Sequence, residues 1–301
     1  MLTAITRAVS PSLTHCDLSF IDRQPIDFAK ANEQHHAYER QLAALGARVI
    51  SLPAEPELPD SMFVEDPALV LDELAVIFPL GTETRRREAP SIAAALAPFR
   101  KLAKISLPGT IEGGDILRIG RKLFVGLTAR SNSEGIKQLS AIVEPYGYHV
   151  LGVPVTGCLH LKSAVTSLGN DTLLANRAWF DFSSFDGYQW VDVDPAEAHA
   201  GNALALAGTV IFPASFQRTR ARIEARGFHV TSIDISELQK AESGLTCSSL
   251  LFDAIDHVTA ECDALVERMQ TPQSQEAMKA AFDATPAELG HAALAAMRRR
   301  K

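Results

Sequence analysis

The stretch Glu112-Gly-Gly-Asp-Ile-Leu-Arg-Ile-Gly-Arg-Lys-Leu-Phe-Val125 joins a polar, glycine-containing segment to an apolar run typical of a β-hairpin. Residues 133–146 follow with the apolar spacing of an amphipathic helix, and residues 149–155 have the pattern of a further strand. The stretch therefore begins a unit made of a polar segment, a hairpin, a helix and a strand.

This unit returns about every fifty residues, which is the period of a repeat architecture. The other units begin at Val64-Glu-Asp66, His160, Gly201-Asn202 and Cys247, and their apolar runs cover residues 68–78, 163–174, 203–212 and 250–252. We expect helices at 88–96 and 218–226, strands at 102–107 and 229–233, and a hairpin turn at Gly169-Asn-Asp171. The last unit needs a strand at 2–8 and a helix at 28–45 from the other end of the chain.

Five such units favour an α/β ring in which each polar segment begins a hairpin. A ring would bring the following residues to one end of a central channel: Glu65, Asp66, Glu112, Asp115, His160, Asn202 and Cys247. Alternation of strands and helices also fits a parallel, doubly wound sheet, so the periodicity alone leaves both architectures open.

Composition limits the classes of function. The 301 residues include 47% hydrophobic ones, enough for a substantial core, and the net charge of −7 gives no general basic surface for nucleic acid or anionic lipid. The beginning of the chain lacks a secretory-signal pattern, and no run approaches the roughly 20 apolar residues of a membrane span, so we expect a cytoplasmic location. Cys16, Cys158, Cys247 and Cys262 show no zinc-site spacing, which favours reduced thiols.

Three units begin with groups that can act together in catalysis. Cys247 lies in Ser243-Gly-Leu-Thr-Cys-Ser-Ser249, His160 in Cys158-Leu-His-Leu-Lys-Ser163, and Glu112 in the stretch quoted above. Together they would supply a nucleophile, a proton carrier and an anion for a cationic substrate. A guanidinium is resonance-stabilised and needs a thiolate to attack it, and its planar N–H groups pair with carboxylates such as those of Asp66 and Glu112.

The flanking segments carry a resemblance to a known family. In chain order they are Phe63-Val-Glu-Asp-Pro67, Thr84-Arg-Arg-Arg-Glu88, Ile111-Glu-Gly-Gly-Asp115, Gly126-Leu-Thr-Ala-Arg130, Leu159-His-Leu-Lys162, Gly201-Asn202 and Leu245-Thr-Cys247. This order resembles the dimethylarginine dimethylaminohydrolases (dimethylargininases), members of the guanidine-modifying pentein superfamily. The resemblance runs from about Leu2 to Phe252 and does not extend over the remaining residues.

The resemblance implies the pentein fold, a five-bladed α/β propeller of ββαβ-type repeats, as a catalytic domain over residues 1–252. It also implies a hydrolase acting on C–N bonds in linear amidines, which converts Nω-methylated arginine to L-citrulline and dimethylamine or methylamine without cofactor or metal. Catalysis would use Cys247, His160 and Glu112, with a covalent S-alkylthiouronium on Cys247. The residues that would hold the substrate are Leu18, Asp60, Glu65, Asp66, Arg85, Arg130 and Ala241.

Residues 253–301 have the spacing of two or three amphipathic helices, with breaks at Thr271-Pro272 and Thr285-Pro286. We expect a helical C-terminal extension that packs outside the propeller or against a second subunit in a homodimer.

Other interpretations stay open on sequence alone. An arginine deiminase or an amidinotransferase would use the same cysteine, histidine and acid, although the chain leaves no room for the extra helical domain that arginine deiminases generally carry. A protein of a different class, a non-catalytic binding protein on the same propeller, would have no reason to keep all three groups. For single residues, Cys247 would otherwise be a core hydrophobe, Glu65-Asp66 a turn pair, and Arg85 part of a solvated face.

Overall fold

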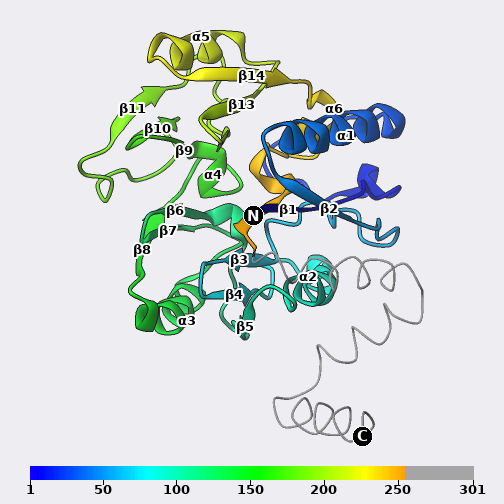
Figure 1. The fold of residues 1–301 in the computed structure, drawn as a ribbon, viewed down its shortest axis with the longest axis vertical. Coiled ribbons are helices and arrows are strands. Elements are labelled where there is room, and N and C mark those ends of the chain that lie inside the picture. The colour runs from blue at the N-terminus through cyan, green and yellow to red at the C-terminus, as the bar shows by residue number, and fades with distance from the viewer. Residues whose placement is uncertain (255–301) are drawn as a thin grey trace, which may run out of the picture.

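The computed structural model describes residues 1–254, which form five three-stranded sheets arranged in a ring (Figure 1). In sheet order the strands are β15 (Leu250–Asp253), β1 (Leu2–Arg7) and β2 (Arg48–Leu52); β3 (Ala68–Val70), β4 (Leu74–Ile77) and β5 (Lys101–Lys104); β6 (Ile116–Ile119), β7 (Lys122–Leu127) and β8 (His149–Pro154); β9 (Val165–Gly169), β10 (Thr172–Ala175) and β11 (Gln189–Asp192); and β12 (Leu204–Leu206), β13 (Thr209–Pro213) and β14 (His229–Ile233).

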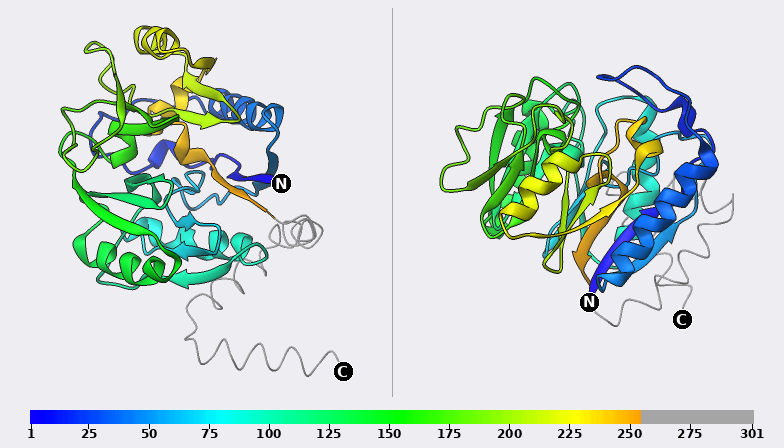
Figure 2. Two further views of the ribbon diagram at one scale, coloured as in Figure 1. Left: turned by 60° about the vertical axis from the view of Figure 1, so that its left-hand side comes forward. Right: turned by 90° about the horizontal axis from the view of Figure 1, so that it is seen from above.

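Every sheet has the same internal order. The first strand pairs antiparallel with the central strand, and the third strand pairs parallel with the central one. A parallel partner requires a crossover connection, and helices supply it in four of the five sheets. These helices are α1 (Phe28–Ala44), η2 with α2 (Thr84–Glu88 and Ala89–Leu96), α3 (Ser133–Val143) and α5 (Gln217–Ala225), and they lie at the rim of the ring (Figures 1 and 2).

The ring is closed by the two ends of the described chain. Leu2 of β1 pairs with Asp253 of β15, so one sheet takes strands from both ends. Five hydrophobic clusters form the core, and each lies between two neighbouring sheets. For example, one cluster joins Ile5 and Leu250 to Ala75 and Ile77 of the next sheet. Because all five interfaces are packed, the structure confirms the predicted five-bladed α/β propeller.

One repeat departs from the predicted ββαβ pattern. Residues 176–188, which connect β10 to β11, form turns and bends instead of a helix. Their aromatic side chains pack between the blades: the ring of Phe185 stacks on Phe124 with centroids 4.1 Å apart and meets Phe180 edge-on at 5.5 Å. Asp, Ser and Gly residues in this segment favour turns, so burial of the aromatic rings sets its path.

The predicted hairpin turn before β10 is confirmed in detail. Asn170 and Asp171 both have positive φ, 49° and 52°, as the two central residues of a type I′ turn require.

The innermost strand of each blade lines the centre of the ring. A cavity of about 290 Å³ runs between β3, β6, β9, β12 and β15. The polar segments immediately before these five strands lie at one end, because each blade repeats the same chain direction. The remaining short helices are η1 (Leu13–His15), η3 (Gly113–Asp115), η4 (Glu144–Tyr146), α4 (Leu161–Ala164), α6 (Ser236–Gln239) and η5 (Thr246–Ser248).

Within residues 1–254, none of the helices has the length and apolar character needed to span a bilayer. The expected helical extension lies outside the described residues, apart from its first two positions.

Candidate active site

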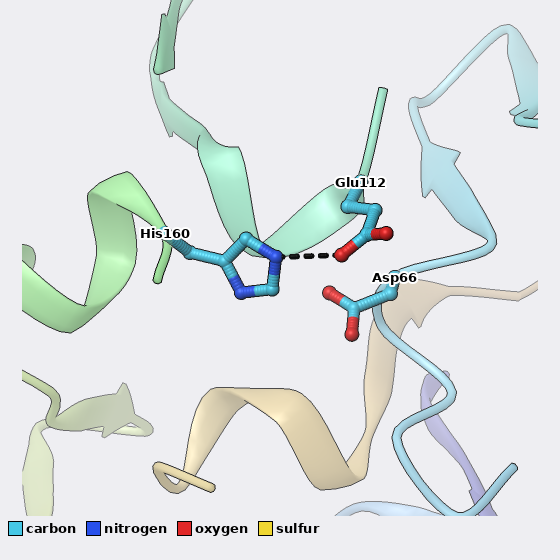
Figure 3. A group of neighbouring side chains, drawn as sticks. All are labelled: Asp66, Glu112 and His160. Atoms are coloured by element: carbon cyan, nitrogen blue, oxygen red, sulfur yellow. Dashed lines mark hydrogen bonds and ion pairs between the residues drawn. The ribbon is translucent and has the colours of Figure 1, made fainter. Parts of the chain in front are cut away.

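The histidine and the glutamate predicted to act together are in direct contact. Nε2 of His160 lies 2.7 Å from Oε2 of Glu112, and both side chains are buried (Figure 3). Burial alone would lower the pKa of His160, but the charges of Asp66, Asp115 and Glu112 outweigh it and raise the pKa to about 9. Burial opposes ionisation of Glu112 as well, yet its bond to His160 and the nearby cation Arg85 lower its pKa to about 2. The pair is therefore an imidazolium and a carboxylate at neutral pH.

The two glycines after Glu112 are required by close approach. A Cβ atom on Gly113 would lie 2.0 Å from the carbonyl oxygen of Glu65, and one on Gly114 would lie 2.5 Å from Nδ1 of His160. The backbone N–H of Gly114 also donates to Oδ1 of Asp66 at 3.0 Å. The Gly-Gly pair thus lets the imidazole and Asp66 pack directly on the backbone.

Arg85 is held by acids on every side. Its Nε and Nη2 donate to the two carboxylate oxygens of Glu88 at 3.0 and 2.9 Å, and its Nη1 donates to Asp66 at 2.9 Å. Nη1 also lies 3.7 Å from Oε2 of Glu112. The guanidinium is buried, so Arg85 is a fixed internal cation that orders the three carboxylates.

A second buried arginine is held more loosely. The Nη1 of Arg130 lies 3.4 Å from Oε1 of Glu112 and 3.3 Å from the hydroxyl of Thr82, and Nη2 lies 3.4 Å from the hydroxyl of Ser19. These bonds are all long, so Arg130 has donor capacity for another anion. Its backbone N–H donates to the hydroxyl of Thr128 at 3.0 Å, two residues before Asn132 caps the start of α3.

Asp60 faces the same region. It accepts a hydrogen bond from the backbone N–H of Asp17 at 3.1 Å. Burial raises the pKa of Asp60 to about 6, against the lowering effect of Arg85. Asp60 is thus mainly ionised at pH 7 and loses its charge in mild acid.

Cys247 lies in η5 at the base of a small cavity shared with these groups. The cavity measures about 20 Å³, which is room for about one water molecule. Its lining is Asp17, Asp60, Phe63, Asp66, Arg85, Arg130, Leu159, His160, Ala241, Glu242, Ser243 and Cys247. Burial, together with the charges of Glu65 and Asp66, raises the pKa of the Cys247 thiol to about 12, so the thiol is protonated when the site is empty.

The other predicted site residues take different places. Ala241 lines the small cavity, whereas Leu18 is half-buried in the loop between Asp17 and Ser19 and packs on an apolar cluster. Glu65 lines the central cavity instead, paired with Lys162 and accepting a bond from the Thr246 hydroxyl at 2.9 Å. Substrate contact by Leu18 and Glu65 stays a prediction.

The cysteine beside His160 has another environment. Cys158 is buried in an apolar cluster, and its thiol donates to the carbonyl oxygen of His160 at 3.2 Å. Burial, reinforced by the charge of Asp115, raises its pKa to about 12. Cys16, Cys158 and Cys247 are free thiols, and Cys262 lies outside the described residues.

Ligand atoms of Asp66, Glu112 and His160 lie within 4.8 Å of one another, a spacing that a metal ion could bridge (Figure 3). However, Arg85 and protonated His160 already supply positive charge to these carboxylates. The geometry therefore suits a planar cation beside the acids better than a divalent ion, and the absence of a metal cofactor stays a prediction.

This arrangement combines a thiol, a proton-carrying imidazole and several carboxylates around one cavity. It can perform nucleophilic attack on a cationic carbon centre, with proton transfer by His160.

Comparison with known proteins places the chain in a family. A family model described as arginine deiminase matches residues 29–196. The N(G),N(G)-dimethylarginine dimethylaminohydrolase of Pseudomonas aeruginosa is 37% identical over 228 residues, which are 75% of this chain and 90% of the relative. The chain belongs to the dimethylarginine dimethylaminohydrolase family.

A second member of the dimethylarginine dimethylaminohydrolase family, from Streptomyces coelicolor, is 34% identical over 249 residues, covering 82% of this chain and 95% of its own length. A solved structure of the P. aeruginosa enzyme, a Cys-to-Ser mutant complexed with citrulline, matches with a TM-score of 0.80 and 35% identity. The match covers 84% of this chain and 100% of that one. These relatives confirm the resemblance to the dimethylarginine dimethylaminohydrolases and the pentein fold.

Three residues of the candidate site, Glu88, Asp17 and Glu242, were not predicted from the sequence. Glu88 holds Arg85, and its spacing of three residues from Arg85 on a helical segment is a signal for such a pair. Asp17 and Glu242 line the cavity from two irregular loops that carry no periodic signal. The carboxylate of Glu242 accepts bonds from the N–H groups of Ser19 and Phe20 at 2.7 and 2.6 Å, which closes one loop against the other.

Proposed function

We propose that this chain hydrolyses Nω-methylated arginine, either asymmetric dimethylarginine or monomethylarginine, to L-citrulline and dimethylamine or methylamine. The observation that carries the proposal is one cavity lined by Cys247, His160 and Asp66, with Glu112 bonded behind the imidazole. The relative from P. aeruginosa carries the name of this activity, and its solved structure holds citrulline.

In the proposed mechanism the bound guanidinium lowers the pKa of Cys247, because its positive charge offsets the burial and the anions that raise it. The thiolate adds to the central guanidinium carbon. His160 then donates a proton to the departing amine nitrogen, and the C–N bond breaks to leave an S-alkylthiouronium. Neutral His160 next takes a proton from water, and the resulting hydroxide adds to the same carbon. The C–S bond then breaks as the new hydroxyl gives its proton to the departing sulfur, which releases citrulline and restores the resting thiol.

The carboxylates and arginines supply substrate positions. Asp66 lines the cavity and is the carboxylate for the guanidinium, Glu112 adds negative charge from behind His160, and Asp60 faces the α-amine. Arg130 is the better donor for the α-carboxylate, since every bond that its guanidinium makes is long. Arg85 contributes through its charge and by ordering Asp66, because its Nε, Nη1 and Nη2 already donate to Glu88 and Asp66.

Substrate entry requires movement of the cavity wall. A space of about 20 Å³ does not admit a methylated arginine, and the loop carrying Asp17 and Ser19 closes it through bonds to Asp60, Thr84 and Glu242. We propose that this loop opens to admit substrate.

The pKa shifts predict an unusual pH profile. The free site holds a protonated thiol and a protonated imidazole, whereas the reactive state has a thiolate and an imidazolium, one proton fewer. We therefore expect kcat/KM to rise about tenfold per pH unit towards pH 9 and to level off above it, where His160 loses its own proton. Protonation of Asp60 should steepen the fall below about pH 6.

Glu112→Gln should move the upper break of this profile to lower pH, because loss of the carboxylate lowers the pKa of His160. Glu73→Gln is the matched control, since Glu73 bonds Arg121 and Tyr148 at the surface. Initial rates measured from pH 5 to 10 check both expectations. A wild-type kcat/KM that declines between pH 7 and 9 would contradict the protonated resting thiol.

The function is tested by citrulline formation from a panel of guanidines with purified protein. We expect turnover of mono- and asymmetrically dimethylated arginine at a kcat/KM at least tenfold above that for arginine. Preference for arginine would indicate a deiminase, and failure with every guanidine would leave the binding-protein alternative. A homodimer, a cytoplasmic location and the absence of nucleic-acid or membrane partners stay predictions.

A further inference from the structure

Asn202, which precedes β12, lies between the segment that carries Cys247 and the segment that carries His160. Its side chain is buried and makes four hydrogen bonds. Leu245 and Thr246 are the two residues before Cys247. Their backbone N–H groups donate to Oδ1 of Asn202 at 2.7 and 3.1 Å. Nδ2 donates to the carbonyl oxygen of Lys162 at 2.9 Å and to the Thr246 hydroxyl at 3.1 Å. One amide group thus joins two loops.

The chemistry at this position requires an asparagine-like amide. The oxygen meets two donors and the nitrogen meets two acceptors, so an acid or an apolar residue would leave buried groups unpaired. The fit is also close, since a Cβ atom on Gly244 would lie 2.4 Å from Cγ of Asn202. The loop before Cys247 therefore runs directly over the Asn202 side chain.

The contact extends to the catalytic groups on both sides. Lys162 is two residues after His160, and the next residue, Ser163, donates its N–H to the carbonyl oxygen of His160 at 3.0 Å. On the other side, the N–H of Glu65 donates to the carbonyl oxygen of Cys247 at 3.2 Å, and the Thr246 hydroxyl bonds the Glu65 carboxylate. Movement of Asn202 would thus change the placement of the thiol relative to the imidazole.

We propose that Asn202 is a positioning residue that holds the Cys247 loop against the His160 segment. This inference rests on the proposed function and adds a residue that touches neither substrate nor reacting atoms. Because a nucleophile must be held in a narrow range of positions, loss of this bridge should slow chemistry while freeing the thiol to react with small reagents.

The test compares Asn202→Ala with Asn176→Ala. Asn176 is a matched control, since its amide also bridges two backbone segments, donating to Ala198 at 3.0 Å and accepting from Ala178 at 3.2 Å, but in the turn after β10. Asn202→Ala should lower kcat at least tenfold with KM within threefold of wild type. Alkylation of Cys247 by iodoacetamide, followed on its peptide by mass spectrometry, should become at least fivefold faster. Asn176→Ala should leave kcat and the alkylation rate of Cys247 within twofold of wild type, although its melting temperature should fall by a similar amount.

Asn202→Asp keeps the size of the side chain and both acceptor bonds, so it replaces the alanine variant if that variant does not fold. It should lower kcat and raise the rate of Cys247 alkylation, each at least threefold. Unchanged alkylation of Cys247 in the folded variants would overturn the inference, whatever happens to kcat. If wild type turns over no guanidine, the proposed function fails, and the alkylation rates still decide the positioning role.

Discussion

Cys247→Ser is expected to abolish turnover of every guanidine, with kcat at least about 10⁴-fold below wild type. The hydroxyl is nearly isosteric with the thiol but far less nucleophilic, and its proton is held more tightly even beside a bound cation. Substrate binding should stay within a few fold, because Asp66 and Arg130, the groups proposed to bind the guanidinium and the α-carboxylate, are unchanged. Steady-state rates check the loss of turnover, and isothermal titration with asymmetric dimethylarginine checks that substrate binding is retained.

Cys158→Ser is the matched control for this substitution. Its thiol lies in an apolar cluster and bonds the carbonyl oxygen of His160, so we expect nearly normal kcat and a modest loss of stability. Turnover retained by the Cys247 variant, or lost only in the Cys158 variant, would contradict the choice of nucleophile.

His160→Gly should slow the reaction by about 10²–10⁴-fold and change which species accumulates. In the proposed mechanism His160 acts first as an acid for amine departure and then as a base for water. Without it, slow thiol attack should continue while hydrolysis stalls, so the covalent intermediate should build up. Added imidazole should partly restore turnover by entering the space that the side chain leaves.

His199→Gly provides the comparison, since His199 is exposed and its ring packs edge-on against Trp179. It should keep wild-type kinetics with and without imidazole. Rapid product release by the His160 variant, with no intermediate, would contradict the second role of His160.

The repeat pattern left both a ring and a doubly wound sheet open, and the resemblance to the dimethylarginine dimethylaminohydrolases decided for the five-bladed propeller. The pattern did place each polar segment at the same point before a hairpin. This placement also predicted that His160, Glu112 and Cys247 would meet, although they are far apart in sequence. Burial of apolar runs between blades follows directly from such a pattern.

Side-chain pairing could not be predicted in the same way. Arg85 and Asp66 were both expected at the site, but sequence does not show that Glu88 occupies two nitrogens of Arg85. Glu65 precedes Asp66, and both lie in the turn before β3, yet Glu65 faces Lys162 and the central cavity whereas Asp66 lines the small cavity. The path of a turn sets these directions, and the sequence carries no periodic signal for it.

Irregular segments account for most of the remaining differences. The turns at residues 176–188 replace a helix because aromatic packing outweighs the repeat pattern. The loops that bring Asp17 and Glu242 to the cavity have no periodicity, and their position depends on bonds between backbone N–H groups and carboxylates.

The most direct test of the account is mass spectrometry of acid-quenched reactions with asymmetric dimethylarginine, taken before steady state. The account predicts a covalent adduct on the peptide that contains Cys247, with the mass of substrate less dimethylamine, and a larger amount of it in His160→Gly. An adduct on Cys158, or citrulline produced with no adduct on any cysteine in either protein, would contradict it.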